Sequence, residues 1–165
     1  MLTTDEALMH APVDVCFNAA ADVEGWPDAL EHYRWVHFQR RDGFGHGRVE
    51  MAARRAFGPL PYPVWWVSEM WIDKEAPAIH YSHVDGVTTG MDVVWSFHPV
   101  SDETTRVRIV HDWVGGPAWP LPHAARRLIA ATVIGPVFIH HVASHTLVGI
   151  GRKAERLYSE SGRIR

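Results

Sequence analysis

The C-terminal third of the chain carries a long apolar pattern at helical spacing. Between Leu128 and Leu157, apolar residues recur every three or four positions, which places them along one face of a helix. Gly135 and Pro136 interrupt the pattern, because a proline inside a helix removes a backbone hydrogen bond and clashes with the preceding turn. We therefore expect a break there, followed by a long helix over residues 136–158. The rest of the chain must cover its apolar face.

The uncharged part of this pattern is too short to cross a membrane. It runs over residues 128–139, between Arg126-Arg127 on one side and His140-His141 on the other. A bilayer requires about 20 consecutive apolar residues in a helix. We therefore expect no membrane span.

Composition narrows the class of protein further. A chain of 165 residues with 47% hydrophobic and 21% charged residues is typical of one globular domain, which we expect to span residues 1–165. The net charge of -3 and the dispersed arginines argue against a nucleic-acid partner. Cys16 is the only cysteine, which excludes an internal disulfide, and the N-terminal residues show no apolar signal segment. These features predict a cytoplasmic protein.

The middle of the chain reads as an antiparallel meander. Six segments with strand character are separated by turn signals, and they cover residues 34–41, 48–56, 64–73, 78–85, 89–98 and 104–114. A weaker strand candidate at 3–10 precedes them, with short helices expected over 11–21 and 29–33. The proline-rich stretch 57–63 is expected to be a loop, because proline cannot donate to a strand ladder.

Alternation along each strand predicts which side chains face inward, because successive side chains point to opposite faces of a sheet. On segment 64–73, Glu69 and Asp73 mark the outer face, so Trp65 and Trp71 are also expected outside. The inner set on this segment is Val64, Trp66, Ser68, Met70 and Ile72. The same rule places His111 on an apolar face with Ile109. Of the eight tryptophans, we expect some to line a cavity, because only a few such large rings fit an ordinary core.

This order of elements coincides with a known sequence pattern. The residues that carry it are Ala11-Pro12-Val13-Asp14-Val15-Cys16-Phe17, Asp22-Val23-Glu24-Gly25-Trp26-Pro27 with Tyr33 after it, Trp66-Val67-Ser68, and Gly90-Met91-Asp92-Val93-Val94-Trp95. The chain resembles the START-like (SRPBCC, helix-grip) superfamily and is most similar to its polyketide aromatase/cyclase branch. The resemblance implies an α+β fold in which a curved antiparallel sheet of about seven strands wraps around a long C-terminal helix. Two short helices would follow the first strand.

The same resemblance implies a ligand cavity between the sheet and the helix. The family's cavity positions match Trp26, Tyr33, Trp66, Ser68, Met91, Trp95 and His111, with His83 across a small gap. Phe138 and Val142 would close the cavity from the helix. A pocket for a drug-sized ligand measures roughly 300 to 1,000 Å³, so we expect a volume of a few hundred Å³.

One position departs from the family pattern. The aromatase/cyclases carry an arginine two residues after the serine, whereas this chain has Met70, whose thioether cannot donate a hydrogen bond. Arg55 is a candidate replacement, because it shares a strand face with Met51 and Ala53. The alternative for Arg55 is an arginine at a strand end that faces water.

Three residues could perform acid/base chemistry in such a cavity: His111, Tyr33 and His83. Burial among apolar neighbours favours a neutral imidazole at His111, which is the form that a general base requires. A histidine that is merely hydrogen-bonded in the core is the alternative reading. Ser68 lacks the Gly-x-Ser-x-Gly context of a nucleophile, so we expect its hydroxyl to contact ligand.

A metal site is not expected. His141 and His145 are spaced i, i+4 and so share a helix face, but no Glu, Asp or Cys accompanies them at ligand spacing. No other motif requires a cofactor.

Three functions remain open at this point. The first is a polyketide aromatase/cyclase that folds a poly-β-ketone and promotes ring closure by acid/base chemistry. The second is a non-catalytic carrier or sensor of a lipid, a quinone or a similar hydrophobic molecule. The third is a protein-interaction domain that uses Trp65 and Trp71. The expected partners are a hydrophobic small molecule and, for an enzyme of this branch, an acyl carrier protein; the chain is expected to be a monomer or a homodimer.

Overall fold

The computed structural model describes residues 1–57, 60–116, 122, 124 and 139–162, with the backbone alone at 55–57 and 60–62. The chain begins with strand β1 (Leu2–Met9), helix α1 (Val13–Ala21), a 3-10 turn η1 (Val23–Gly25) and helix α2 (Trp26–Ala29). The strands that follow are β2 (Tyr33–Gly43), β3 (His46–Phe57), β4 (Leu60–Asp73), β5 (Ala78–Gly86), β6 (Asp92–Ser101) and β7 (Thr104–Asp112). Helix α4 (His140–Gly162) is the last element.

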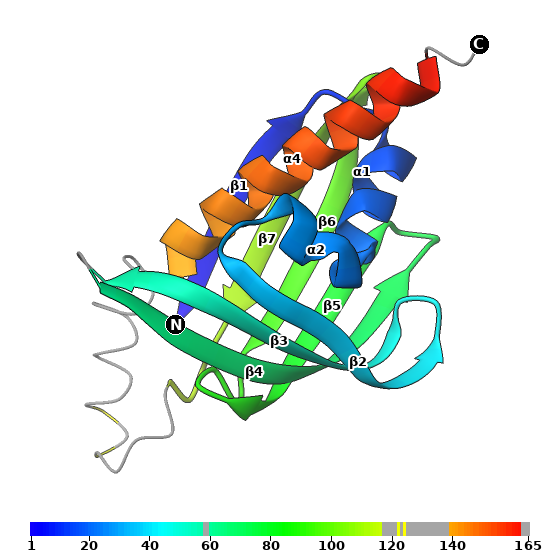
Figure 1. Ribbon diagram of the computed structural model, residues 1–165. Helices are drawn as coiled ribbons and strands as arrows, with labels where there is room; N and C mark the ends of the chain where they lie inside the picture. The colour runs from blue at the N-terminus through cyan, green and yellow to red at the C-terminus, as the bar shows by residue number, and fades with distance from the viewer. Residues whose placement is uncertain (58–59, 117–121, 123, 125–138, 163–165) are drawn as a thin grey trace.

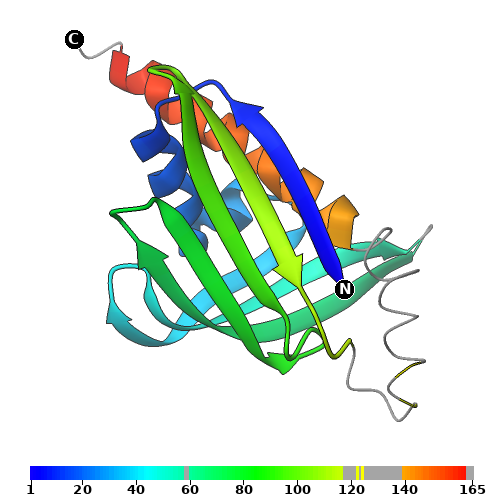
Figure 2. The same ribbon diagram turned by 180° about the vertical axis from the view of Figure 1, so that it is seen from behind.

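The strands form one antiparallel sheet of seven strands in the order β1-β7-β6-β5-β4-β3-β2. β2 to β7 follow one another along the sheet, whereas β1 joins at the far edge by pairing with β7, from Leu2 opposite Asp112 to Met9 opposite Thr105. The sheet curves, and α4 lies across its inner face beside β1 and α1 (Figure 1). The outer faces of β1, β7, β6 and β5 are seen from behind (Figure 2). The expected helix-grip fold is confirmed.

Period-two alternation explains how the sheet divides into faces. On β6, Val93, Trp95 and Phe97 are buried, whereas Asp92 and His98 are exposed. On β4 the expected inner set from Val64 to Ile72 is buried, and Trp65 and Trp71 are 44% and 43% exposed on the outer face. The predicted faces of both strands are therefore confirmed.

Two local expectations were wrong. The second short helix covers Trp26–Ala29 rather than 29–33, because Pro27 occupies the first turn, where a proline needs no hydrogen-bond acceptor. Residues 57 and 60–63 belong to strands rather than to a loop, because β3 and β4 continue their pairing to Phe57 opposite Leu60; residues 58–59 lie outside the described residues. β5 pairs with β4 only from Trp66 onward, so among the described residues the prolines at 61 and 63 lie on a part of β4 that pairs with β3 alone.

Helix α4 agrees with the expected C-terminal helix over its described part. The start of the predicted helix, residues 136–138 including Phe138, lies outside the described residues. The buried side of α4 consists of Ala143, Thr146, Leu147, Ile150, Gly151 and Ala154. Across the described ranges, no helix is long and apolar enough to cross a membrane.

Candidate functional site

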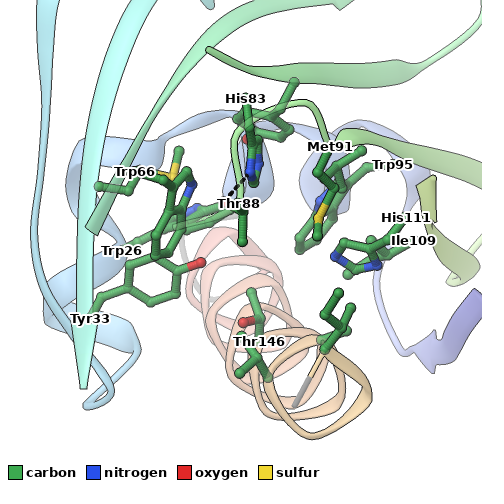
Figure 3. Close-up of a pocket in the computed structure, with 16 residues that line it drawn as sticks. Trp26, Tyr33, Trp66, His83, Thr88, Met91, Trp95, Ile109, His111 and Thr146 are labelled. Atoms are coloured by element: carbon green, nitrogen blue, oxygen red, sulfur yellow. Dashed lines mark hydrogen bonds between the residues drawn. The ribbon is translucent and has the colours of Figure 1, made fainter. Parts of the chain in front are cut away.

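A pocket lies between the inner face of the sheet and α4 (Figure 3). Its lining comes from α2, β2 to β7, the β5–β6 turn and the start of α4. The lining residues are Trp26, Tyr33, Met51, Trp66, Tyr81, His83, Thr88, Met91, Val93, Trp95, Ile109, His111, Ile139, Val142, Ala143 and Thr146. The volume of the pocket is about 70 Å³, which is smaller than the expected volume of a few hundred Å³. Apolar and aromatic side chains dominate, so the pocket suits a hydrophobic ring.

Aromatic rings in mutual contact form one wall of this pocket. Trp26 packs edge-on against Tyr33 with ring centroids 5.2 Å apart, and its ring lies 5.6 Å from that of Trp95. The Trp26 indole also donates a hydrogen bond to the Ala20 carbonyl at 3.1 Å. Because this N–H already has a protein acceptor, Trp26 contributes shape and apolar surface rather than a hydrogen bond to a ligand.

His83 is held in the pocket wall by its own turn. Its Nδ1 lies 2.6 Å from Thr88 Oγ1, and its ring stacks on Trp66 at a centroid distance of 6.0 Å. The backbone of His83 pairs with Met91 and Gly90 across the β5–β6 turn at 2.9 and 2.8 Å. These contacts orient the imidazole within a buried environment.

His111 and Tyr33 reach the pocket from other strands. His111 lies on β7 opposite Val93 of β6 and Thr3 of β1, and it is half-buried. Tyr33 is the first residue of β2 and is buried. The labelled side chains of Tyr33, His83 and His111 surround the pocket from different sides (Figure 3).

The first turns of α4 close the pocket. Thr146, which lines it, lies 3.1 Å from the Nε2 atom of His32 in the segment before β2. His140, which lies between the lining residues Ile139 and Val142 at the start of α4, forms an ion pair with Asp5 of β1. Burial raises the pKa of Asp5, although the neighbouring His140 acts in the opposite direction.

The pocket environment also perturbs the pKa of the Tyr81 phenol. Burial raises its pKa well above 10.0, and the proximity of Tyr33 contributes in the same direction. The phenol therefore keeps its proton at any physiological pH.

The structure brings together most of the residues predicted from sequence. Those that line the pocket are Tyr33, His83, His111, Trp26, Trp66, Met91, Trp95 and Val142. Ser68 and Met70 are buried on the same inner face but are not part of the lining. Arg55 lies in β3, where the structure describes its backbone but not its side chain. Phe138 lies outside the described residues.

Several lining residues were missed by the sequence reading. Tyr81 could have been found, because it alternates with Ile79 and His83 on β5 and so shares their inner face. Thr88 gave no signal, since it belongs to a turn whose path only the folded chain determines. In the described part of the chain, no group of three His, Cys, Asp or Glu side chains is arranged to hold a metal ion.

A curved antiparallel sheet closed by a C-terminal helix, with an apolar pocket between them, defines a START-like, helix-grip protein. The chain belongs to the family described as polyketide cyclase / dehydrase and lipid transport, whose sequence profile matches residues 9–137.

Individual relatives agree with this assignment. A protein from Streptomyces cyaneus named "Putative polyketide cyclase" is 27% identical over 129 residues, which cover 74% of this chain and 78% of the relative. The Zhui aromatase/cyclase from Streptomyces sp. R1128 superimposes with a TM-score of 0.75 at 21% identity, covering 100% of this chain and 96% of that one. A START superfamily protein from Mycobacterium smegmatis has a TM-score of 0.67 at 15% identity, covering 96% and 97%. At these identities the two structures support the fold alone.

Proposed function

We propose that this chain binds a hydrophobic aromatic or polyketide-like molecule in the pocket and catalyses its cyclisation by acid/base chemistry. The observation that carries the proposal is that Tyr33, His83 and His111, from three different strands, line one apolar pocket. Family membership supports it, as do the names of the Streptomyces relative and the Zhui structure, which refer to a polyketide cyclase and an aromatase/cyclase.

Ring closure of a poly-β-ketone needs a base, a hydrogen-bond donor and a controlled chain conformation. In the proposed mechanism, neutral His111 removes a proton from a methylene between two ketones, while Tyr33 or His83 donates to the oxygen that becomes an enolate. The methylene carbon then bonds to a distant carbonyl carbon of the same chain, whose oxygen takes the proton back from His111. Loss of water from this aldol product, followed by tautomerisation of the remaining ring ketones to phenols, forms the aromatic ring, so no oxidant or other co-reactant is needed.

The pocket volume limits what can be enclosed. A volume of about 70 Å³ lies well below the roughly 300 to 1,000 Å³ of pockets for drug-sized ligands. In the described conformation the pocket can therefore take only a small part of such a chain, and a full-length polyketide requires the site to widen. We expect the ring-forming segment to occupy the space beside Trp26 and Trp95.

The proposal is tested with a phenyl-capped linear tetraketone, which closes to a dihydroxybenzophenone when one methylene attacks a carbonyl and one water is lost. Removal of a positioned base typically lowers a rate ~10² to 10⁴-fold. After the uncatalysed rate is subtracted, His111→Gln should therefore close the ring more slowly than the wild type by a factor in this range. The product is followed by its ultraviolet absorbance. His98→Gln is the matched control, because His98 is exposed on the outer face of β6 and should leave the rate unchanged.

A non-catalytic carrier is the second candidate, and the polarity of the pocket favours it. No Lys, Arg, Asp or Glu is among its described lining residues, and Met70 supplies no donor. A carrier would bind the tetraketone or its cyclised product but would not accelerate ring closure. If His111→Gln closes the ring as fast as the wild type, His111 is not the base. If the wild-type protein binds the tetraketone but does not accelerate ring closure, the protein is a carrier.

A further inference from the structure

We infer that the Tyr81 hydroxyl is a hydrogen-bond donor to a ligand oxygen, and that it selects neutral ring compounds bearing a ketone or phenol oxygen over hydrocarbons and carboxylates. The inference rests on the proposed function, because it concerns the ligand of the same pocket.

Tyr81 carries a buried polar atom that the fold leaves unsatisfied. The residue lies on β5, lines the pocket and is only 4% exposed. Its hydroxyl oxygen is buried and makes no hydrogen bond to any described residue. Since buried polar groups are almost always paired, such a hydroxyl on a residue that lines the pocket points to a partner supplied by a bound ligand.

The neighbours of Tyr81 explain why the protein does not supply that partner. Its cross-strand neighbours are Met70 on β4 and Val93 on β6, and neither side chain has a strong acceptor. The Trp26 ring, with its centroid 6.5 Å from the Tyr81 ring, also packs an aromatic surface against it. By contrast, the two lining threonines have protein contacts, Thr88 with His83 and Thr146 with His32.

The chemistry of the phenol specifies what the ligand atom must be. Burial raises the Tyr81 pKa, so the group remains protonated and serves as a donor rather than as a base. The matching ligand atom is therefore an acceptor such as a carbonyl oxygen. A carboxylate would also accept, but no Lys or Arg among the described lining residues could balance its charge, so burying it would be unfavourable.

Two small probes of nearly the same shape separate this hydrogen bond from hydrophobic binding. Acetophenone has a carbonyl oxygen where α-methylstyrene has a methylene group. Each probe is titrated into the wild-type chain and into the Tyr81→Phe and Tyr158→Phe variants. Binding is followed by NMR through the tryptophan indole signals. Tyr158 is the matched control, because its hydroxyl donates a hydrogen bond to the Glu103 carboxylate at 2.8 Å and the residue is not part of the pocket lining.

Loss of one neutral hydrogen bond should weaken acetophenone binding to Tyr81→Phe by about 3- to 10-fold. Binding of α-methylstyrene should stay within about twofold in all three proteins, because it has no acceptor. Equal effects on both probes, or no effect on either, would overturn the role of Tyr81 while leaving ligand binding intact. If neither probe perturbs the pocket signals of the wild type, the proposed function fails together with the inference.

A second measurement needs no variant and therefore does not depend on how well Tyr81→Phe folds. The infrared carbonyl stretch of acetophenone bound to the wild type should lie below its position in cyclohexane, because a hydrogen bond weakens the C=O bond. A bound carbonyl at the cyclohexane position would show that no donor contacts it and would overturn the inference.

Discussion

Cys16 illustrates how a single residue reports on local packing. Cys16 belongs to α1 and is fully buried; its thiol lies 3.5 Å from the Ala11 carbonyl oxygen, and burial raises the pKa of the thiol. We therefore expect Cys16 to react with a thiol-specific disulfide reagent at least ~100-fold more slowly in the native protein than in denaturant, since both thiolate formation and access are suppressed. Because Cys16 is the only cysteine, the absorbance of the released thiolate measures this one site. Fast native labelling would mean that α1 opens readily.

At the scale of elements, Gly149 marks a close approach of α4 to Ala29 and Leu30, at the end of α2. A Cβ there would overlap Leu30 Cδ2 and lie 3.3 Å from the Ala29 carbonyl oxygen, whereas at Gly151 the nearest atom, Met9 Cγ, is an ordinary 3.5 Å away. Alanine favours a helix over glycine by about 1 kcal/mol, so Gly151→Ala should be neutral or stabilising. Gly149→Ala should instead lower the free energy of unfolding by about 1 to 3 kcal/mol, as overpacking does.

Urea denaturation of the two glycine variants provides the measurement, and each serves as the control for the other. Both changes add one methyl group to the same helix, so a difference between them isolates the contact with α2. Equal stabilities would show that Leu30 moves aside without loss.

At the scale of the whole molecule, the first and last described elements, β1 and α4, pack side by side, and Asp5 of β1 pairs with His140 at the start of α4. Burial raises the pKa of the Asp5 carboxyl in the folded state. The contribution of this carboxyl to the free energy of unfolding is therefore complete at pH values below its ordinary pKa of 3.8, and it is lost as the pH rises through the raised pKa of the folded state. Asp5→Asn imitates the protonated form. It should therefore be more stable than the wild type at pH 7, with a difference that shrinks as the pH falls below about 4.

Thermal unfolding across this pH range measures the effect. Asp102→Asn is the control, because Asp102 is exposed in the β6–β7 turn and should give no pH-dependent difference. A less stable Asp5→Asn at pH 7 would show that the ion pair with His140 outweighs the desolvation of the carboxylate.

The sequence by itself determined most of the element types and the faces of β4 and β6. Period-two alternation placed Trp66 and Trp95 inside and Trp65 and Trp71 outside, because the pleat of a strand leaves no other choice once one face is buried. Helical spacing likewise identified α4. The family pattern then indicated a pocket with His83 and His111 in its wall.

Only the tertiary structure decided which inner residues reach the pocket and how much room they leave. Ser68, Met70 and Tyr81 all share the inner face, yet Tyr81 alone of the three lines the pocket. Alternation specifies the direction of a side chain, but the curvature of the sheet and the depth at which α4 docks specify what that side chain meets. Those quantities arise from contacts between distant segments, such as Asp5 with His140, and no local pattern encodes them.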